Sequence, residues 1–311
     1  MNHNHSHDHD HHGHSHDHSH TPTSFGKAFA IGISLNTLFI VAEVIYGLKA
    51  NSLALVADAG HNLSDVLGLF MAWGATYLAK RQPTHRYTYG LQSSSIVAAL
   101  ANAVMLLFVT GGICWEAIQR FHKPEDVAGT TVMAVAAFGI FVNGFSAWLF
   151  MKGSKDDLNI KGAFLHMLGD AAISAGVVVS GFVILQTGWH WLDAAVSIAV
   201  SMAIIYGTWG LLRDSMNLTL HAVPAHIDYA EVKDFLTNSQ GVKEVHDLHI
   251  WAMSTTEVAL SAHLLMQGGH PGDHFLKHLS HELQEHFRIS HATIQIEMGD
   301  AECALAPENV V

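Results

Sequence analysis

The chain has 311 residues, of which 50% are hydrophobic and 14% are charged, and its mean hydropathy is positive. This composition excludes an ordinary soluble domain and indicates a membrane protein with a smaller soluble part. The formal net charge of −12 excludes nucleic acid as a partner, because binding to phosphates needs a basic surface.

Residues 1–20 are a low-complexity segment with ten histidines and three aspartates. No signal peptide is visible there, because the pattern of a charged segment followed by an apolar one is missing. The histidines alternate with Asp, Ser and Gly, which favours a native disordered tail over a purification tag. Such a tail, predicted over residues 1–24 on the cytoplasmic side, would bind divalent metal ions loosely.

Six apolar segments follow, and each is long enough to cross a bilayer, which takes about 20 residues. They are predicted at residues 25–48, 53–79, 91–118, 127–151, 162–186 and 190–212, within a transmembrane domain at 25–213. If the N-terminus is cytoplasmic, the inner side carries eight lysines and arginines and the outer side carries three. We therefore expect both termini to face the cytoplasm, where basic residues concentrate.

The chain changes character after Arg213. Helices are predicted at 229–238 and 274–287, and strands at 242–253, 257–266 and 291–298. This α-β-β-α-β order predicts a small open-faced α+β domain at residues 214–298, followed by a C-terminal tail at 299–311. The expected fold class is therefore an all-α six-helix membrane bundle with a small α+β cytoplasmic domain. The two cysteines, Cys114 and Cys303, are far apart, so neither a disulfide framework nor a cysteine-based metal site is expected.

Ionisable residues interrupt two of the apolar segments with the same spacing. His61 and Asp65 lie four residues apart in the second segment, as do His166 and Asp170 in the fifth. Residues at i and i+4 share one face of a helix, so two such helices side by side would direct two imidazoles and two carboxylates at one point. A tetrahedral zinc ion accepts these donors. Coordination would also offset the cost of a charge in lipid, roughly 2.5–3.5 kcal/mol.

Other polar residues of the apolar segments have more than one interpretation. Asp58 lies on a similar helix face to Asp65 and either supports a ligand or fills a packing position. Glu43, in the first segment, could line a wet cavity or bond between helices. Asp193, near the start of the sixth segment, is interpreted as a helix cap.

In these stretches the chain resembles the cation diffusion facilitator family, and within it the bacterial zinc exporters related to the vesicular zinc transporters. The resemblance covers residues 25–298 and rests on SLALVADAGHNLSD, RYTYG, AFLHMLGD, VHDLHIWAM and HATIQIEM. It implies a homodimer in the bacterial inner membrane, with one transport site per protomer between the second and fifth spans. It also implies alternating access coupled to inward movement of protons, and a metallochaperone-like cytoplasmic domain.

Carried over by position, the resemblance implies that the transport ligands are His61, Asp65, His166 and Asp170. A histidine at position 61 goes with a preference for Zn²⁺ over Cd²⁺ in the family, and ligand chemistry leaves Co²⁺ and Ni²⁺ as further candidate substrates. Some family members have a second site between spans two and three. Only His85 remains near that place in this chain, so we expect no ordered metal ion there.

The resemblance also implies a metal site in the cytoplasmic domain. Relatives carry ligands at the positions of His246, His263 and Glu297, and His278 and His291 are additional candidates. A surface-solvated histidine is the alternative interpretation for each of these imidazoles.

The expected function is zinc efflux by zinc/proton antiport around a His₂Asp₂ site, without enzymatic activity. One alternative is a membrane-anchored zinc sensor that holds the ion with the same ligands but does not move it. The other alternative is an intramembrane zinc hydrolase. The sequence disfavours the hydrolase, because it contains no HExxH motif and four protein ligands leave no position for a nucleophilic water.

Overall fold

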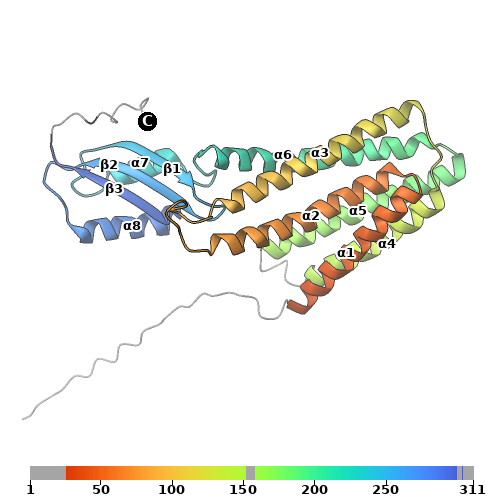
Figure 1. The fold of residues 1–311 in the computed structure, drawn as a ribbon, viewed down its shortest axis with the longest axis horizontal. Coiled ribbons are helices and arrows are strands. Elements are labelled where there is room, and N and C mark those ends of the chain that lie inside the picture. Colours follow the sequence, from red (N-terminus) through yellow and green to blue (C-terminus); the bar gives the residue numbers. More distant parts are fainter. Residues whose placement is uncertain (1–25, 152–157, 300–302, 304–311) are drawn as a thin grey trace, which may run out of the picture.

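The computed structural model describes residues 26–151, 158–299 and 303, and every structural statement below refers to these residues. Six long helices, α1 to α6, run side by side in one bundle, and a domain with a three-stranded sheet lies at one end of it (Figure 1). The expected fold class is confirmed. The predicted histidine-rich tail at 1–24 and most of the tail at 299–311 lie outside the described residues.

All six expected apolar segments are helical. They are α1 (Gly26–Lys49), α2 (Leu53–Ala79), α3 (Ser94–His122), α4 (Gly129–Met151), α5 (Leu158–Thr187) and α6 (Trp191–Thr219). Since the shortest has 23 residues, each is at least about 35 Å long and can cross a hydrocarbon core of about 30 Å. Within the described part of the chain, α3, α4, α5 and α6 are apolar enough to span a membrane by composition alone. The helices α1 and α2 pack directly against these four.

Glycines bring α4 and α5 close together. A Cβ atom added to Gly129 in α4 would lie 2.9 Å from the carbonyl oxygen of Gly181 in α5, and one added to Gly181 would lie 3.1 Å from that of Gly129. Small residues at helix contacts are expected in lipid, where association depends on close packing rather than on the hydrophobic effect. This contact fixes the position of α5, which carries His166 and Asp170.

A buried carboxylate ties the start of α2 to α6. Asp193, in the first turn of α6, accepts hydrogen bonds from the Ser52 hydroxyl at 2.5 Å and from the Leu53 backbone N–H at 2.7 Å. Asp193 is therefore a helix cap, as interpreted from the sequence, but it caps the start of α2 and not the start of its own helix, α6. A carboxylate is favourable there because the first N–H groups of a helix lack intrahelical partners.

The sheet domain follows α6 in the expected order. Its elements are α7 (Tyr229–Thr237), β1 (Glu244–Ala252), β2 (Val258–Leu265), α8 (Asp273–Phe287) and β3 (His291–Glu297). The strand order is β1-β2-β3, in which β1 and β2 are antiparallel and β2 and β3 are parallel. The parallel pair requires a crossover connection, and α8 provides it.

The two faces of the sheet have different roles. Leu260 and Leu264 of β2 are fully buried in a core with Leu236 of α7 and Leu283 of α8. Successive side chains of a strand point to opposite faces. His263, between the two buried leucines, therefore lies on the face that the core does not use.

The sheet domain also contacts the bundle at the connector between α2 and α3. The Ser93 hydroxyl donates to the Met253 carbonyl at 3.1 Å, and the Thr255 backbone N–H donates to the Ser95 hydroxyl at 3.1 Å. Met253 and Thr255 belong to the turn between β1 and β2. The domain is thus attached to the bundle at the end of α6 and again at the start of α3.

The cap from Asp193 predicts a specific loss of stability. Asp193→Ala leaves the Ser52 hydroxyl and the Leu53 N–H buried without an acceptor, so we expect it to lower the free energy of unfolding by about 1–3 kcal/mol. Equilibrium unfolding in mixed detergent micelles would measure this. Ser201→Ala, in the same helix, is the matched control, because the buried Ser201 hydroxyl has no hydrogen-bond partner among the described residues. Equal stability of the two variants would contradict the assignment.

Candidate metal centres

The first candidate centre lies between α2 and α5, where the two His-x-x-x-Asp pairs meet. His166 Nε2 lies 2.9 Å from Asp65 Oδ2, and His61 Nε2 lies 3.7 Å from Asp170 Oδ1. Each of these two contacts joins a residue of α2 to a residue of α5. Within the helices, the His61–Asp65 and His166–Asp170 atoms are 3.8 Å and 3.7 Å apart. The structure therefore brings all four residues together.

Three of these residues form a compact group of possible ligands: atoms of His61, His166 and Asp170 all lie within 4.8 Å of one another, whereas Asp65 lies outside this group and reaches it through its contact with His166. With bonds of about 2.0–2.2 Å to zinc, the donor atoms of a tetrahedron lie about 3.3–3.6 Å apart. The four separations between imidazole nitrogens and carboxylate oxygens, 2.9–3.8 Å, bracket that value. The second oxygen of Asp170, Oδ2, is buried without a hydrogen-bond partner among the described residues, so donor capacity remains for a cation.

The four side chains differ in exposure along the helices. Asp170 and His61 are 3% and 18% exposed, whereas Asp65 and His166 are 33% and 40% exposed. Asp65 lies closer than His61 to the end of α2 that leads to the sheet domain, and His166 lies closer than Asp170 to the start of α5. The centre is therefore more open toward the sheet-domain side and closed at Asp170.

A second polar group lies behind these ligands. Asp58 accepts a hydrogen bond from the Ser174 hydroxyl of α5 at 3.2 Å, and Glu43 of α1 accepts one from the Asn62 amide at 3.4 Å. Both carboxyl groups are fully buried. Neither belongs to the group of metal-ligating atoms that the described residues form in the bundle.

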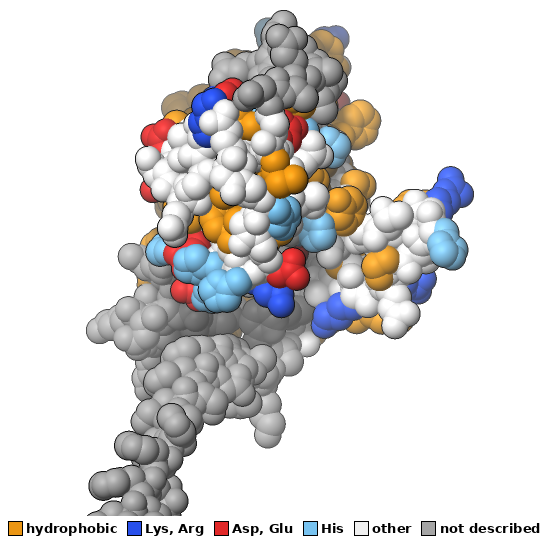
Figure 2. Space-filling model, turned by 90° about the vertical axis from the view of Figure 1, so that its left-hand side faces the viewer, with side chains coloured by type: hydrophobic (Ala, Val, Ile, Leu, Met, Phe, Trp, Pro, Cys, Tyr) orange, Lys and Arg blue, Asp and Glu red, His pale blue; other side chains and the backbone are white. Residues whose placement is uncertain are grey.

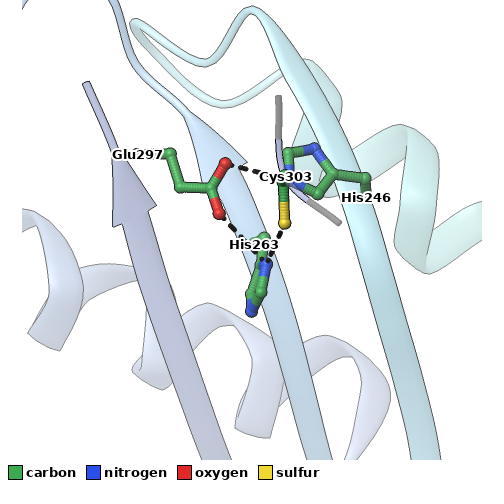
Figure 3. A group of neighbouring side chains, drawn as sticks. All are labelled: His246, His263, Glu297 and Cys303. Atoms are coloured by element: carbon green, nitrogen blue, oxygen red, sulfur yellow. Dashed lines mark hydrogen bonds and ion pairs between the residues drawn. The ribbon is translucent and has the colours of Figure 1, made fainter. Parts of the chain in front are cut away.

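The second candidate centre lies on the uncovered face of the sheet (Figure 3). His246 of β1 and His263 of β2 are directly opposite each other, and their rings are 5.5 Å apart. The Glu297 carboxylate of β3 lies 3.0 Å from His246 Nε2 and 3.2 Å from His263 Nδ1. The three residues that the sequence suggested as cytoplasmic ligands therefore meet at one point.

A fourth group, Cys303, completes this centre. Its Sγ lies 3.6 Å from His263 Nδ1, and the four possible ligand atoms all lie within 4.8 Å of one another. Burial raises the pKa of Glu297, but hydrogen bonds from Gln295 and Cys303 outweigh this effect and hold the pKa below its usual value. The carboxylate is thus ionised and available to a cation. The expectation that no cysteine takes part in a metal site therefore does not agree with this group of ligand atoms. The distance between Cys303 and Cys114 excludes only a site that needs both cysteines, and the signal for Cys303 was a thiol soon after Glu297.

Asp247 orients one of the imidazoles. Its Oδ2 lies 3.3 Å from His263 Nε2, on the side of the ring opposite Glu297 and Cys303. Asp247 has a φ of 50° and lies where the pairing of β1 with β2 shifts register. A carboxylate that accepts from one ring nitrogen leaves the other free to bind a metal ion, an arrangement common in metal sites.

The remaining candidate histidines lie elsewhere. His278 is exposed on α8, 3.8 Å from Glu282, and His291 lies at the other end of β3 from Glu297, with its ring 5.5 Å from that of Tyr89. His85 is exposed in the connector between α2 and α3, and no metal-ligating group of described residues includes it. Figure 2, which views the sheet-domain end of the molecule, shows histidine side chains beside acidic ones on this surface.

Comparisons with known proteins agree with this architecture. Residues 29–218 match the family described as the cation efflux transmembrane domain, and residues 224–298 match the cation efflux protein cytoplasmic domain. The zinc transporter ZitB of Escherichia coli is 38% identical over 271 residues, which cover 86% of each chain. The metal cation efflux system protein CzcD of Cupriavidus metallidurans is 36% identical, covering 91% of this chain and 90% of its own. The cadmium, cobalt and zinc/H(+)-K(+) antiporter of Bacillus subtilis is 34% identical, covering 87% and 88%.

The position of Cys303 predicts a thiolate ligand in the sheet centre. Co²⁺ bound to a thiolate has a charge-transfer absorption band in the near ultraviolet that nitrogen and oxygen ligands do not give. We expect this band in the Co²⁺-loaded full-length protein and in Cys114→Ser, but not in Cys303→Ser. Cys114 is the matched control, because it is the other cysteine of the chain and lies in α3. A band that persists in Cys303→Ser would contradict the assignment.

Proposed function

This chain belongs to the cation efflux family, and we propose that it exports Zn²⁺ from the bacterial cytoplasm in exchange for protons. The family consists of cation transporters, so the chain is a multi-pass membrane protein of metal efflux and not an enzyme. The observation that carries the proposal is the meeting of two imidazoles and two carboxylates between α2 and α5, whose nitrogen–oxygen separations of 2.9–3.8 Å are close to those in a tetrahedral zinc site. Relatives that are named zinc transporters support Zn²⁺ as the substrate.

The ligand set explains how protons and Zn²⁺ exclude each other. Zinc binds neutral imidazole and ionised carboxylate, so a ligand atom that takes up a proton can no longer donate its lone pair to the metal ion. The two carboxylates, Asp65 and Asp170, neutralise the charge of Zn²⁺, which lowers the cost of holding the ion inside the membrane. Uptake of protons from the outer side would therefore release the ion.

The difference in exposure among the ligands supports a state that is open toward the sheet domain. In that state Zn²⁺ would reach Asp65 and His166 first and would then be enclosed by His61 and Asp170. Opening to the opposite side requires a rearrangement of helices around a site that stays near the middle of the bundle. The relative named as a zinc/H(+)-K(+) antiporter supports counter-movement of a monovalent cation.

We place the sheet domain and both termini in the cytoplasm. The excess of lysine and arginine in the connectors expected on that side supports this orientation. The connector between α2 and α3, which contains several of these basic residues, contacts the sheet domain directly. The match to a cytoplasmic dimer domain supports a dimer, and we propose a homodimer in the bacterial inner membrane.

We further propose that His246, His263, Glu297 and Cys303 bind Zn²⁺ in the cytoplasmic domain. This centre does not lie in the membrane, so its role would be to collect the ion or to report its concentration. The histidine-rich segment at residues 1–20 would act in the same way, as a set of weak sites that raises the local Zn²⁺ concentration. Cd²⁺, Co²⁺ and Ni²⁺ are further candidate substrates, since the same donors accept them.

Removal of one membrane ligand should stop transport. We expect Asp170→Ala to lower Zn²⁺ flux into proteoliposomes with an imposed pH gradient by at least about 100-fold, more than the loss of a group that only supports a ligand usually costs. His85→Ala, which removes an exposed histidine from a connector, should leave the flux unchanged. Normal flux in Asp170→Ala would contradict the site. Zn²⁺ binding to the wild type without gradient-dependent flux would instead indicate a sensor.

Deletion of residues 1–20 should weaken transport without stopping it. We expect the Zn²⁺ concentration for half-maximal flux to rise roughly a few-fold, because weak sites raise the local ion concentration without contributing to the transport site. The maximal flux should not change. Complete loss of flux in this variant would show that the accessory role is wrong.

A further inference from the structure

A pair of carboxyl groups lies inside the bundle, apart from the four transport ligands. Glu43 of α1 and Asp58 of α2 are fully buried and lie on either side of Asn62: Glu43 accepts a hydrogen bond from the Asn62 amide at 3.4 Å, and Asp58 lies four residues before Asn62 on the same face of α2. An ionised carboxylate is only an acceptor, so two carboxyl groups can form a hydrogen bond only when one of them carries a proton. Two buried carboxyl groups on either side of one amide can therefore share one proton.

The neighbouring side chains donate hydrogen bonds to the pair, but they do not supply the positive charge that two ionised carboxylates would need. The Asn62 amide donates to Glu43 Oε2 at 3.4 Å and the Ser174 hydroxyl donates to Asp58 Oδ2 at 3.2 Å. The other oxygens, Glu43 Oε1 and Asp58 Oδ1, are buried without a partner among the described residues. Two neutral donors cannot neutralise two negative charges, and an unpaired buried charge is strongly unfavourable. The pair thus has room for one dissociable proton.

The charged groups that face the pair belong to the transport site. Asp170 of α5 acts electrostatically on both carboxyl groups, and His61 of α2 acts on Asp58. Asp65 and His166 complete the transport site on the same two helices. The helix α4, which packs against α1, contains no titratable residue. The charged residues of α3 and α6 lie toward the helix ends, and the other titratable residues of these two helices are Cys114 and Tyr206; the charged and imidazole groups are Glu116, Arg120, His122, Asp193, Arg213 and Asp214.

We propose that Glu43 and Asp58 form a proton-binding site of the transport cycle that is separate from the metal ligands. This inference rests on the proposed exchange of Zn²⁺ for protons and assigns part of that exchange to residues that never touch the metal ion.

Electrostatics couple this site to the transport site. When Zn²⁺ binds beside Asp170, its two positive charges favour the ionised form of the nearby pair. The shared O–H bond then breaks, the proton passes to water, and both carboxyl groups are left ionised. When Zn²⁺ leaves, the two negative charges repel each other and one proton returns. Because binding free energies are linked reciprocally, a proton on the pair weakens Zn²⁺ binding by the same factor.

Proton release on metal binding tests the proposal. Full-length protein in detergent and weak buffer is titrated with Zn²⁺, and a pH indicator counts the protons released for each ion bound. We expect Glu43→Gln to release fewer protons than the wild type, by about one per Zn²⁺ bound at the transport site. Glu116→Gln, which alters a partly exposed carboxyl group beside Arg120 in α3, is the matched control and should release as many as the wild type. Equal release by the wild type and Glu43→Gln would overturn the proposal.

Two further measurements keep the test independent of folding and of transport. Asp58→Asn should lose the same proton as Glu43→Gln, and both variants should still exchange Zn²⁺ for Zn²⁺ across liposomes at equal pH. The metal-free wild type should show the infrared carbonyl band of a buried protonated carboxyl group, which disappears on Zn²⁺ binding; its absence would also overturn the proposal. If the wild type does not transport Zn²⁺, the proposed function fails, whereas the proton count and the infrared band still decide on the pair.

Discussion

The contact between Asp65 on α2 and His166 on α5 is the interaction on which the rest of the membrane domain depends. Ionisable side chains inside a bilayer are stable only when they are paired or bound to a cation. The 2.9 Å contact satisfies this condition across two helices that are far apart in the sequence. It therefore determines which faces of α2 and α5 meet, and it places His166 beside His61 and Asp170, whose ligand atoms form one compact group.

The surrounding structure holds the two halves of this site by different means. The helix α2 is anchored at its start by the buried carboxylate of Asp193 and at its end by the connector that contacts the sheet domain. The helix α5 is instead held against α4 by the close approach of Gly129 and Gly181. The four candidate ligands thus lie on two helices that are supported separately.

The sequence was informative wherever the relevant distance lay within one element. The spacing of four residues in HNLSD and HMLGD placed two ligands on one face of each helix, and the alternation in β1 and β2 placed His246 and His263 on the same face of the sheet. Contacts between distant elements were not predictable in this way. Asp193 caps a helix that begins 140 residues earlier, and helical periodicity gives the face of Asp58 but not that Glu43 lies opposite it. Cys303 follows the last strand without any pattern that would direct it toward His263.

The two attachments of the sheet domain have a mechanical consequence. The domain is joined to the end of α6 by the chain and to the start of α3 by hydrogen bonds, and these two helices pack closely together. The sheet domain is thus linked to α3 and α6, against which α2 also packs, whereas α5 with His166 and Asp170 packs mainly against α4. Under the proposed function, a metal ion bound between α2 and α5 would join these two parts of the bundle, and its release would free them to move apart.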